Sequence, residues 1–292
     1  MGALAPLVII LVGAQVAGAC ALVGSFLLLR RMTMLGDAIS HAVLPGIAVA
    51  FLLSGRPQSP WALLGAAAFG LLCAYLVQAL QRAGVREDAG TGVAFTGLFA
   101  LGVLLISAFA DHVHLDLDHV LYGEIAYAPW DLWLVGERSL GPRALWTTGG
   151  IFLLDLAAVL LFYKELKFCA FDPETAEAAG INVRAFHYLL MTLVSVSAVA
   201  AFDAVGAILA VAMLVVPSAT AYLLTDRLSV MLGLAVGLGA LASALGYLLS
   251  RATDTSVAAA MAVSAGGLFA LAFFLAPRHG LVARWRRRRS DG

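Results

Sequence analysis

Nine apolar segments, most of them close to twenty residues long, constrain the fold of this chain more than any other feature. A helix needs about 20 apolar residues to cross the hydrocarbon core of a bilayer. Because lipid offers no hydrogen bonds, a spanning segment must pair its own backbone groups, which favours helices. We therefore predict an all-α fold, a polytopic transmembrane helical bundle that forms one domain over residues 1–292. The predicted spans lie at about 6–29, 38–54, 61–81, 90–109, 144–163, 186–202, 204–224, 228–249 and 256–276.

The composition supports a membrane protein, because 62% of the residues are hydrophobic and only 12% are charged. The first segment has no basic region ahead of it and no small-residue cleavage site, so we interpret it as a retained span. The three cysteines, Cys20, Cys73 and Cys169, form no CxxC pair, which argues against a thiolate metal site or a disulfide framework. The formal net charge is zero, so only the distribution of charge along the chain is informative about partners. We expect no nucleic-acid partner.

The distribution of basic residues predicts the orientation of the chain. Cytoplasmic connections carry the excess of Lys and Arg. One side of the predicted bundle holds fourteen basic residues, and the other holds only Arg56, Arg138, Arg143 and Arg251. This places the N-terminus outside and the C-terminus inside, which requires an odd number of spans. Eight full crossings plus a short broken helix stay open, because Pro45 interrupts segment 38–54, and Asp203 and Pro217 interrupt 186–224.

Two regions outside the spans have distinctive compositions. Residues 110–143 form a longer outer connection whose aromatic residues suit an outer loop or a re-entrant segment at the headgroup level. The tail from Arg284 to Arg289 reads RWRRRR, and we interpret it as a cytoplasmic anchor that contacts anionic membrane lipid.

Asp37 and His41 are the strongest candidates for a functional site. They are four residues apart in an apolar segment, so a helix would place both side chains on one face. A carboxylate and an imidazole together form half of a site for a divalent cation. The alternative for His41 is an interhelical hydrogen bond to a backbone carbonyl.

Four further residues could complete the ligand set. Glu87 and Asp88 open the fourth span and could lie at a similar depth, although acidic residues also stabilise a helix start. Asp118 and His119 belong to an outer region rich in Asp and His that could collect cations at the entrance. A solvated acidic loop explains that region almost as well.

The largest inner connection, residues 164–186, predicts a short capped helix. Asp172 offers a capping carboxylate, Pro173 suits the first helical position, and Glu174 follows in the first turn. Gly180 can adopt the left-handed conformation that ends such a helix after about two turns. A short rigid helix on the cytoplasmic side could act as a mechanical coupler that includes Glu177.

Several of these stretches resemble one known family. Residues 36–51, GDAISHAVLPGIAVAF, closely resemble the second helix of permeases that import zinc, manganese or iron in ATP-binding-cassette (ABC) transporters. Residues 177–180, EAAG, resemble the EAA-type coupling helix of ABC importer permeases, although the string alone is a common helix ending. The similarity continues in the family's order through residues 87–107, 115–125, 171–181 and 205–224. Asp155 and Asp203 depart from the family pattern.

The resemblance implies the membrane permease subunit of an ATP-driven importer for Mn²⁺, Zn²⁺ or Fe²⁺, located in the plasma membrane. It also implies a homodimer with two ATPase subunits and an extracytoplasmic metal-binding protein, and Asp37 and His41 as ligands of the metal. The sequence contains no GxxxxGK[ST] loop, so ATP hydrolysis is expected on a separate subunit. We therefore predict a transporter rather than an enzyme, with the metal as substrate and no permanently bound cofactor.

Two other functions remain open at this point. A proton-coupled secondary metal transporter could use Asp37, Asp155 and Asp203 as a proton relay, but the coupling-helix pattern and the lack of a clear internal repeat argue against it. A permease for a large metal chelate would have little use for an Asp/His pair.

Overall fold

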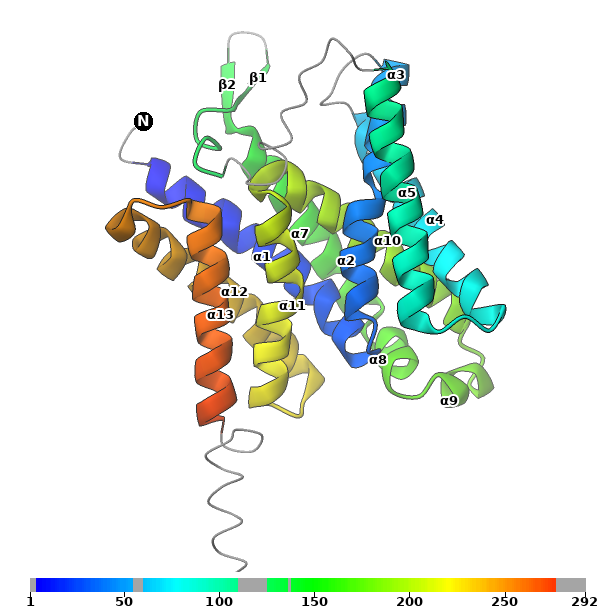
Figure 1. The fold of residues 1–292 in the computed structure, drawn as a ribbon. Coiled ribbons are helices and arrows are strands. Elements are labelled where there is room, and N and C mark those ends of the chain that lie inside the picture. The colour runs from blue at the N-terminus through cyan, green and yellow to red at the C-terminus, as the bar shows by residue number, and fades with distance from the viewer. Residues whose placement is uncertain (1–3, 55–59, 110–124, 136–137, 277–292) are drawn as a thin grey trace, which may run out of the picture. The chain divides into compact units, whose positions relative to one another are not determined.

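The computed structural model describes residues 4–54, 60–109, 125–135 and 138–276, and most of these residues are helical (Figure 1). In chain order the elements are α1 (Ala5–Leu29), α2 (Thr33–Ala42), α3 (Leu44–Ser54), α4 (Pro60–Arg82), α5 (Glu87–Phe109), β1 (Leu132–Val135), β2 (Arg138–Pro142), α7 (Arg143–Leu161), α8 (Tyr163–Phe171), α9 (Pro173–Ala178), α10 (Val183–Val205), α11 (Ala207–Leu224), α12 (Leu228–Thr253) and α13 (Val257–Leu275).

The prediction of nine spans is confirmed for the described part of the chain. Nine helical segments there are long and apolar enough to cross a membrane, and they coincide with the nine apolar runs in the sequence. One of them, Thr33–Leu53, consists of α2 and α3 in succession. The all-α prediction therefore holds, with one small β-hairpin as an addition.

Helices are interrupted near Pro45 and near Asp203, as the sequence predicts, but not at Pro217. Between α2 and α3 the chain turns at Val43, two residues before Pro45, whose ring lacks the N–H that would continue the hydrogen-bond ladder. Between α10 and α11 the break falls at Gly206, which has a φ of 82° that other residues rarely adopt. Pro217, in contrast, lies inside α11 without ending it.

One compact unit contains α1, the β-hairpin, α7 and α11 to α13, together with the last residues of α10. Its helices approach closely at small residues. A Cβ on Gly24 of α1 would overlap the backbone carbonyl of Leu214 in α11. Beside this contact, the buried hydroxyls of Ser25 and Ser218 donate to the Ala21 carbonyl at 2.7 and 3.0 Å. These internal bonds satisfy polar groups that lipid could not.

The hairpin belongs to the same unit and covers part of the predicted outer region. β1 and β2 pair antiparallel, with Leu132 opposite Pro142 and Val135 opposite Arg138. A turn over residues 125–130 precedes them, and Tyr127 packs against Trp130 there with ring centroids 6.4 Å apart. Residues 110–124 lie outside the described part of the chain, so the location of 110–143 at the membrane surface stays a prediction.

The second compact unit contains α2 to α5, α8, α9 and most of α10. Gly46 of α3 and Gly65 of α4 face each other, and a Cβ on either would overlap the backbone carbonyl of the other. A Cβ on Gly102 of α5 would come within 2.8 Å of the Pro45 nitrogen in α3. α4 and α5 therefore pack closely against the backbone of α3, and α2 sits directly on α5 and α4.

Candidate metal-binding pair and coupling segment

α2 places Asp37 and His41 one turn apart on the same helix face, as the spacing predicts. The His41 Nε2 atom lies 3.7 Å from the Asp37 Oδ1 atom. The side chains are 37% and 41% exposed for His41 and Asp37, respectively, so a ligand can reach both. The pair thus presents one carboxylate and one imidazole nitrogen at an accessible face within an apolar span.

Two aromatic residues that the sequence analysis did not single out flank His41. Phe95 and Phe99 lie one turn apart on α5, and their ring centroids are 6.0 and 6.1 Å from that of the imidazole. The Phe99 ring meets His41 edge to face at 87°. The four-residue spacing of the two phenylalanines was visible in the sequence, but only the packing of α2 on α5 shows that both rings contact His41.

Of the four other predicted ligands, the structure describes the side chain of Asp88 alone. Asp88 is exposed near the start of α5, with its Oδ2 atom 3.9 Å from a guanidinium nitrogen of Arg86. Glu87 is the first residue of α5, and its side chain lies outside the described part of the structure. Asp118 and His119 also lie outside the described residues. Among the residues that are described, no group of three or more His, Cys, Asp or Glu side chains could hold a metal ion.

The acidic residues of the proton-relay alternative occupy different settings. Asp155 is fully buried in the middle of α7, within the first unit, where Thr148 of the same helix donates a hydrogen bond to the Gln15 side chain of α1 at 2.8 Å. Asp203 is exposed near the end of α10.

The candidate coupling segment, residues 164–186, contains the capped helix predicted from the sequence. Asp172 accepts hydrogen bonds from the backbone N–H and the hydroxyl of Thr175, at 3.0 and 2.5 Å. These bonds, the hydroxyl foremost, hold the pKa of the Asp172 carboxyl below its ordinary value. Pro173 begins α9 and Glu174 lies in its first turn. Gly180, with a φ of 82°, ends the helix through a hydrogen bond from its N–H to the Glu177 carbonyl.

α8 connects this short helix to the membrane part of the chain. Phe162, next to the start of α8, packs against Phe186 of α10 in an edge contact with centroids 5.6 Å apart. Leu166 and Cys169 are buried, and burial raises the pKa of the Cys169 thiol. Cys169 is thus a buried packing residue, and the Phe162–Phe186 contact joins the start of α8 to α10.

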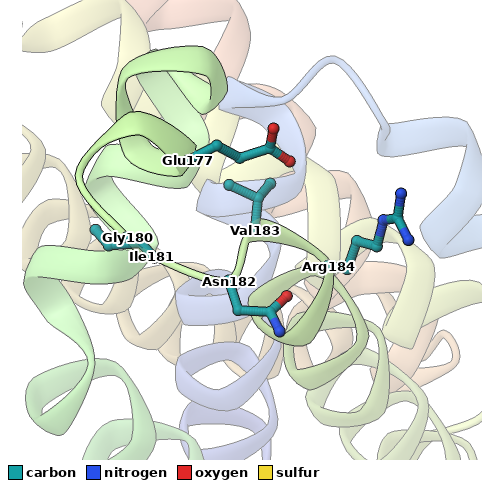
Figure 2. A pocket seen from close by; sticks show the side chains of 6 residues that line it. All are labelled: Glu177, Gly180, Ile181, Asn182, Val183 and Arg184. Carbon is teal, nitrogen blue, oxygen red and sulfur yellow. The ribbon is translucent and has the colours of Figure 1, made fainter.

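A shallow hollow of about 370 Å³ lies where α9 joins α10. Figure 2 shows the lining side chains, with Glu177 projecting from α9 and Val183 and Arg184 from the first turn of α10. The Asn182 side chain accepts a hydrogen bond from the Ala185 N–H at 3.0 Å and so caps α10. Glu177 and Arg184 are both exposed, so the surface beside the short helix carries opposite charges.

The sequence from residue 7 to residue 276 matches the ABC 3 transport family. The chain belongs to the ABC 3 transport family. It is 46% identical over 276 residues to the manganese transport system membrane protein MntD of Bacillus subtilis (strain 168), and the match covers 94% of each chain. It is 43% identical over 277 residues to the zinc transport system membrane protein TroD of Treponema pallidum (strain Nichols), covering 94% of this chain and 75% of TroD.

Solved structures agree with this assignment to the ABC 3 family. PsaBC from Streptococcus pneumoniae, solved in complex with Fab, has a TM-score of 0.79 and 33% identity, covering 97% of this chain and 94% of that chain. An inward-facing putative metal-chelate type ABC transporter has a TM-score of 0.61 at 18% identity and supports the fold alone. The predicted resemblance of the chain to the membrane permeases of metal-importing ABC transporters is therefore confirmed at the level of the family. As a member of the ABC 3 transport family, the chain is a multi-pass membrane protein that acts as the permease of an ABC transporter.

Proposed function

We propose that this permease imports Mn²⁺ or Zn²⁺ and that Asp37 and His41 bind the ion during passage. The observation that carries the proposal is the accessible carboxylate and imidazole pair, 3.7 Å apart on one helix face. Carboxylate suits Mn²⁺ and imidazole suits Zn²⁺, and a mixed pair accepts both. The relatives described above are named for manganese and zinc, and none of those names refers to iron.

A homodimer completes the site in this proposal. Asp37 and His41 provide two donor groups, whereas Zn²⁺ takes about four ligands and Mn²⁺ typically about six. The described residues of one chain offer no third side chain of the right kind nearby. A two-fold axis beside α2 would bring the same pair from a second copy and double the number of donors. The metal would then pass between the two copies.

ATP-binding subunits drive the import in this proposal, and α9 is the element that they contact. The six residues of this helix are fixed by the Asp172 cap, Pro173 and Gly180. Such a rigid helix can pass a movement of the ATPase on to the membrane helices. An extracytoplasmic binding protein would deliver the metal from the other side. This arrangement requires α9 to lie in the cytoplasm, as the basic residues around it predict.

Orientation can be tested with epitope tags on intact cells. We expect a tag at residue 1, or one inserted after Asp254 between α12 and α13, to be accessible from outside, because few basic residues lie on that side. A tag at the C-terminus should be accessible only after permeabilisation. Accessibility of both termini from the same side would contradict the nine-span topology.

The coupling role can be tested by reconstituting the permease with its ATPase in vesicles. Metal uptake should require ATP, and Gly180→Val should reduce ATP-driven uptake about 10-fold, because a β-branched residue is strained at positive φ. Glu177→Arg should have a similar effect by reversing a charge at the contact. Metal binding to the membrane subunit should be unchanged in both variants.

The control for these variants is Gly237→Val on α12, where an added side chain meets nothing within 4 Å. Normal ATP-driven uptake in both coupling variants would contradict the role of α9. Uptake driven by a proton gradient without ATP would instead support a secondary transporter that uses residues such as Asp155.

A further inference from the structure

His41 is enclosed on one side by aromatic rings. Phe95 and Phe99 come from α5, at centroid distances of 6.0 and 6.1 Å and interplanar angles of 38° and 87° to the imidazole. The imidazole therefore has a ring against it at two successive turns of the neighbouring helix, while its Nε2 atom faces Asp37 at 3.7 Å. One side of the candidate ligand is apolar and the other is open.

Phe99 is not placed as an ordinary core residue. Its side chain is 41% exposed, whereas its neighbours Ala94 and Leu98 on the same helix are buried. Exposed apolar side chains are normal on a membrane-spanning helix, so the contact with His41, and not the exposure, distinguishes Phe99. The Phe99 ring meets the imidazole edge to face, and the imidazole shares its helix face with Asp37.

We propose that Phe95 and Phe99 are positioning residues that hold the His41 imidazole as a nitrogen ligand and select for cations that give up water. This inference rests on the proposed role of Asp37 and His41 as metal ligands. In this inference the metal selectivity of the membrane subunit depends on the aromatic wall formed by Phe95 and Phe99, and not on Asp37 and His41 alone.

Two physical effects support this assignment. First, rings packed on the imidazole restrict its rotation, so its nitrogen is held toward the space beside Asp37, and residues that orient a metal ligand strengthen binding. Second, an apolar wall cannot replace the water molecules that a cation loses on that side. Mg²⁺ dehydrates reluctantly and prefers oxygen ligands, so the wall disfavours it. Mn²⁺ and Zn²⁺ accept imidazole nitrogen in exchange for water.

The test uses the full-length permease in lipid nanodiscs, without the binding protein, which could impose a selectivity of its own. Binding of Mn²⁺ is followed by electron paramagnetic resonance, which detects both the free ion and, in pulsed form, the ¹⁴N coupling from a bound imidazole. Titration with Mg²⁺ measures how readily Mn²⁺ is displaced. The variants are Phe99→Ala, Phe99→Leu and, as a matched control on the same helix, Leu104→Ala, whose side chain is 60% exposed.

We expect Phe99→Ala to weaken Mn²⁺ binding about 10-fold, to reduce the ¹⁴N coupling, and to lower the Mg²⁺ concentration needed for displacement by a similar factor. Phe99→Leu should keep most of the wild-type resistance of bound Mn²⁺ to displacement by Mg²⁺, because leucine keeps the apolar bulk. Leu104→Ala should resemble the wild type in all three measurements.

Two results would overturn the inference. One is wild-type Mn²⁺ affinity and ¹⁴N coupling in Phe99→Ala. The other is an equal loss in Phe99→Ala and Leu104→Ala with unchanged displacement by Mg²⁺, which would indicate a general packing defect. A parallel measurement on His41→Ala separates the two proposals, because persistence of the ¹⁴N coupling in that variant would remove His41 as a ligand altogether.

Discussion

Asp37→Asn should lower ATP-driven metal uptake on the order of 100-fold, and His41→Ala should do the same. Asparagine keeps the size and hydrogen bonding of aspartate but removes its charge, so a structural role would tolerate it and a ligand role would not. Alanine at position 41 removes the imidazole nitrogen. Each change takes away one of the two donor groups that the described part of the chain brings together on α2. The measurement is uptake of radiolabelled Mn²⁺ or Zn²⁺ into vesicles, normalised to assembled complex.

Asp254→Asn is the matched control for this loss of charge. Asp254 is exposed at the end of α12 and adopts a left-handed conformation that asparagine also accepts readily. Uptake by this variant should equal that of the wild type. Near-wild-type uptake by Asp37→Asn would return Asp37 to a structural role and shift the search for ligands to the outer region around His119.

Gly24→Val should prevent stable folding of the permease, and Gly24→Ala should lower its melting temperature by about 5 °C or more. Even a single Cβ at position 24 would overlap the Leu214 carbonyl and come within 3.3 Å of the Ser218 hydroxyl. To make room, α1 and α11 must move apart, which would disturb the hydrogen bonds of Ser25 and Ser218 to Ala21. The measurement is thermal unfolding of the purified protein in detergent, followed by size-exclusion chromatography with fluorescence detection.

Gly233→Ala and Gly237→Ala provide the comparison for this stability prediction. An added Cβ at either position meets nothing within 4 Å, and alanine favours a helix more than glycine does. Both variants should be as stable as the wild type or slightly more stable. A melting temperature of Gly24→Ala equal to that of Gly233→Ala would show that the α1–α11 contact does not limit stability.

The spans and the short helix α9 could be predicted because their signals are local. Hydrophobic length identifies a crossing helix without knowledge of its neighbours, and the nine runs coincide with the helices. The cap at Asp172, the proline after it and Gly180 likewise act within a few residues, and α9 has the expected limits. The i, i+4 relation of Asp37 and His41 is also a property of one helix.

The contacts between helices could not be predicted in the same way, because many small residues occur in every span. The Gly233 and Gly237 pair has the spacing of a helix contact, yet the close approaches in the described structure occur at other glycines, among them Gly24, Gly46 and Gly65. The contacts of Phe95 and Phe99 with His41 likewise depend on the packing of α2 against α5. These roles depend on which residues of a neighbouring helix lie opposite, and the sequence of one helix does not give that information.

The position of His41 along the second span has an electrical consequence in the proposed orientation. Together α2 and α3 cover Thr33–Leu53, about 31 Å at 1.5 Å per residue, which is close to the thickness of the hydrocarbon core. His41 lies about 12 Å from the Thr33 end, deep within the voltage drop of the membrane. In the proposed orientation a divalent ion bound there has crossed more than half of that drop from outside. At a potential of 100 mV, negative inside, this favours arrival of the ion by about 3 kcal/mol and opposes its escape outward by the same amount.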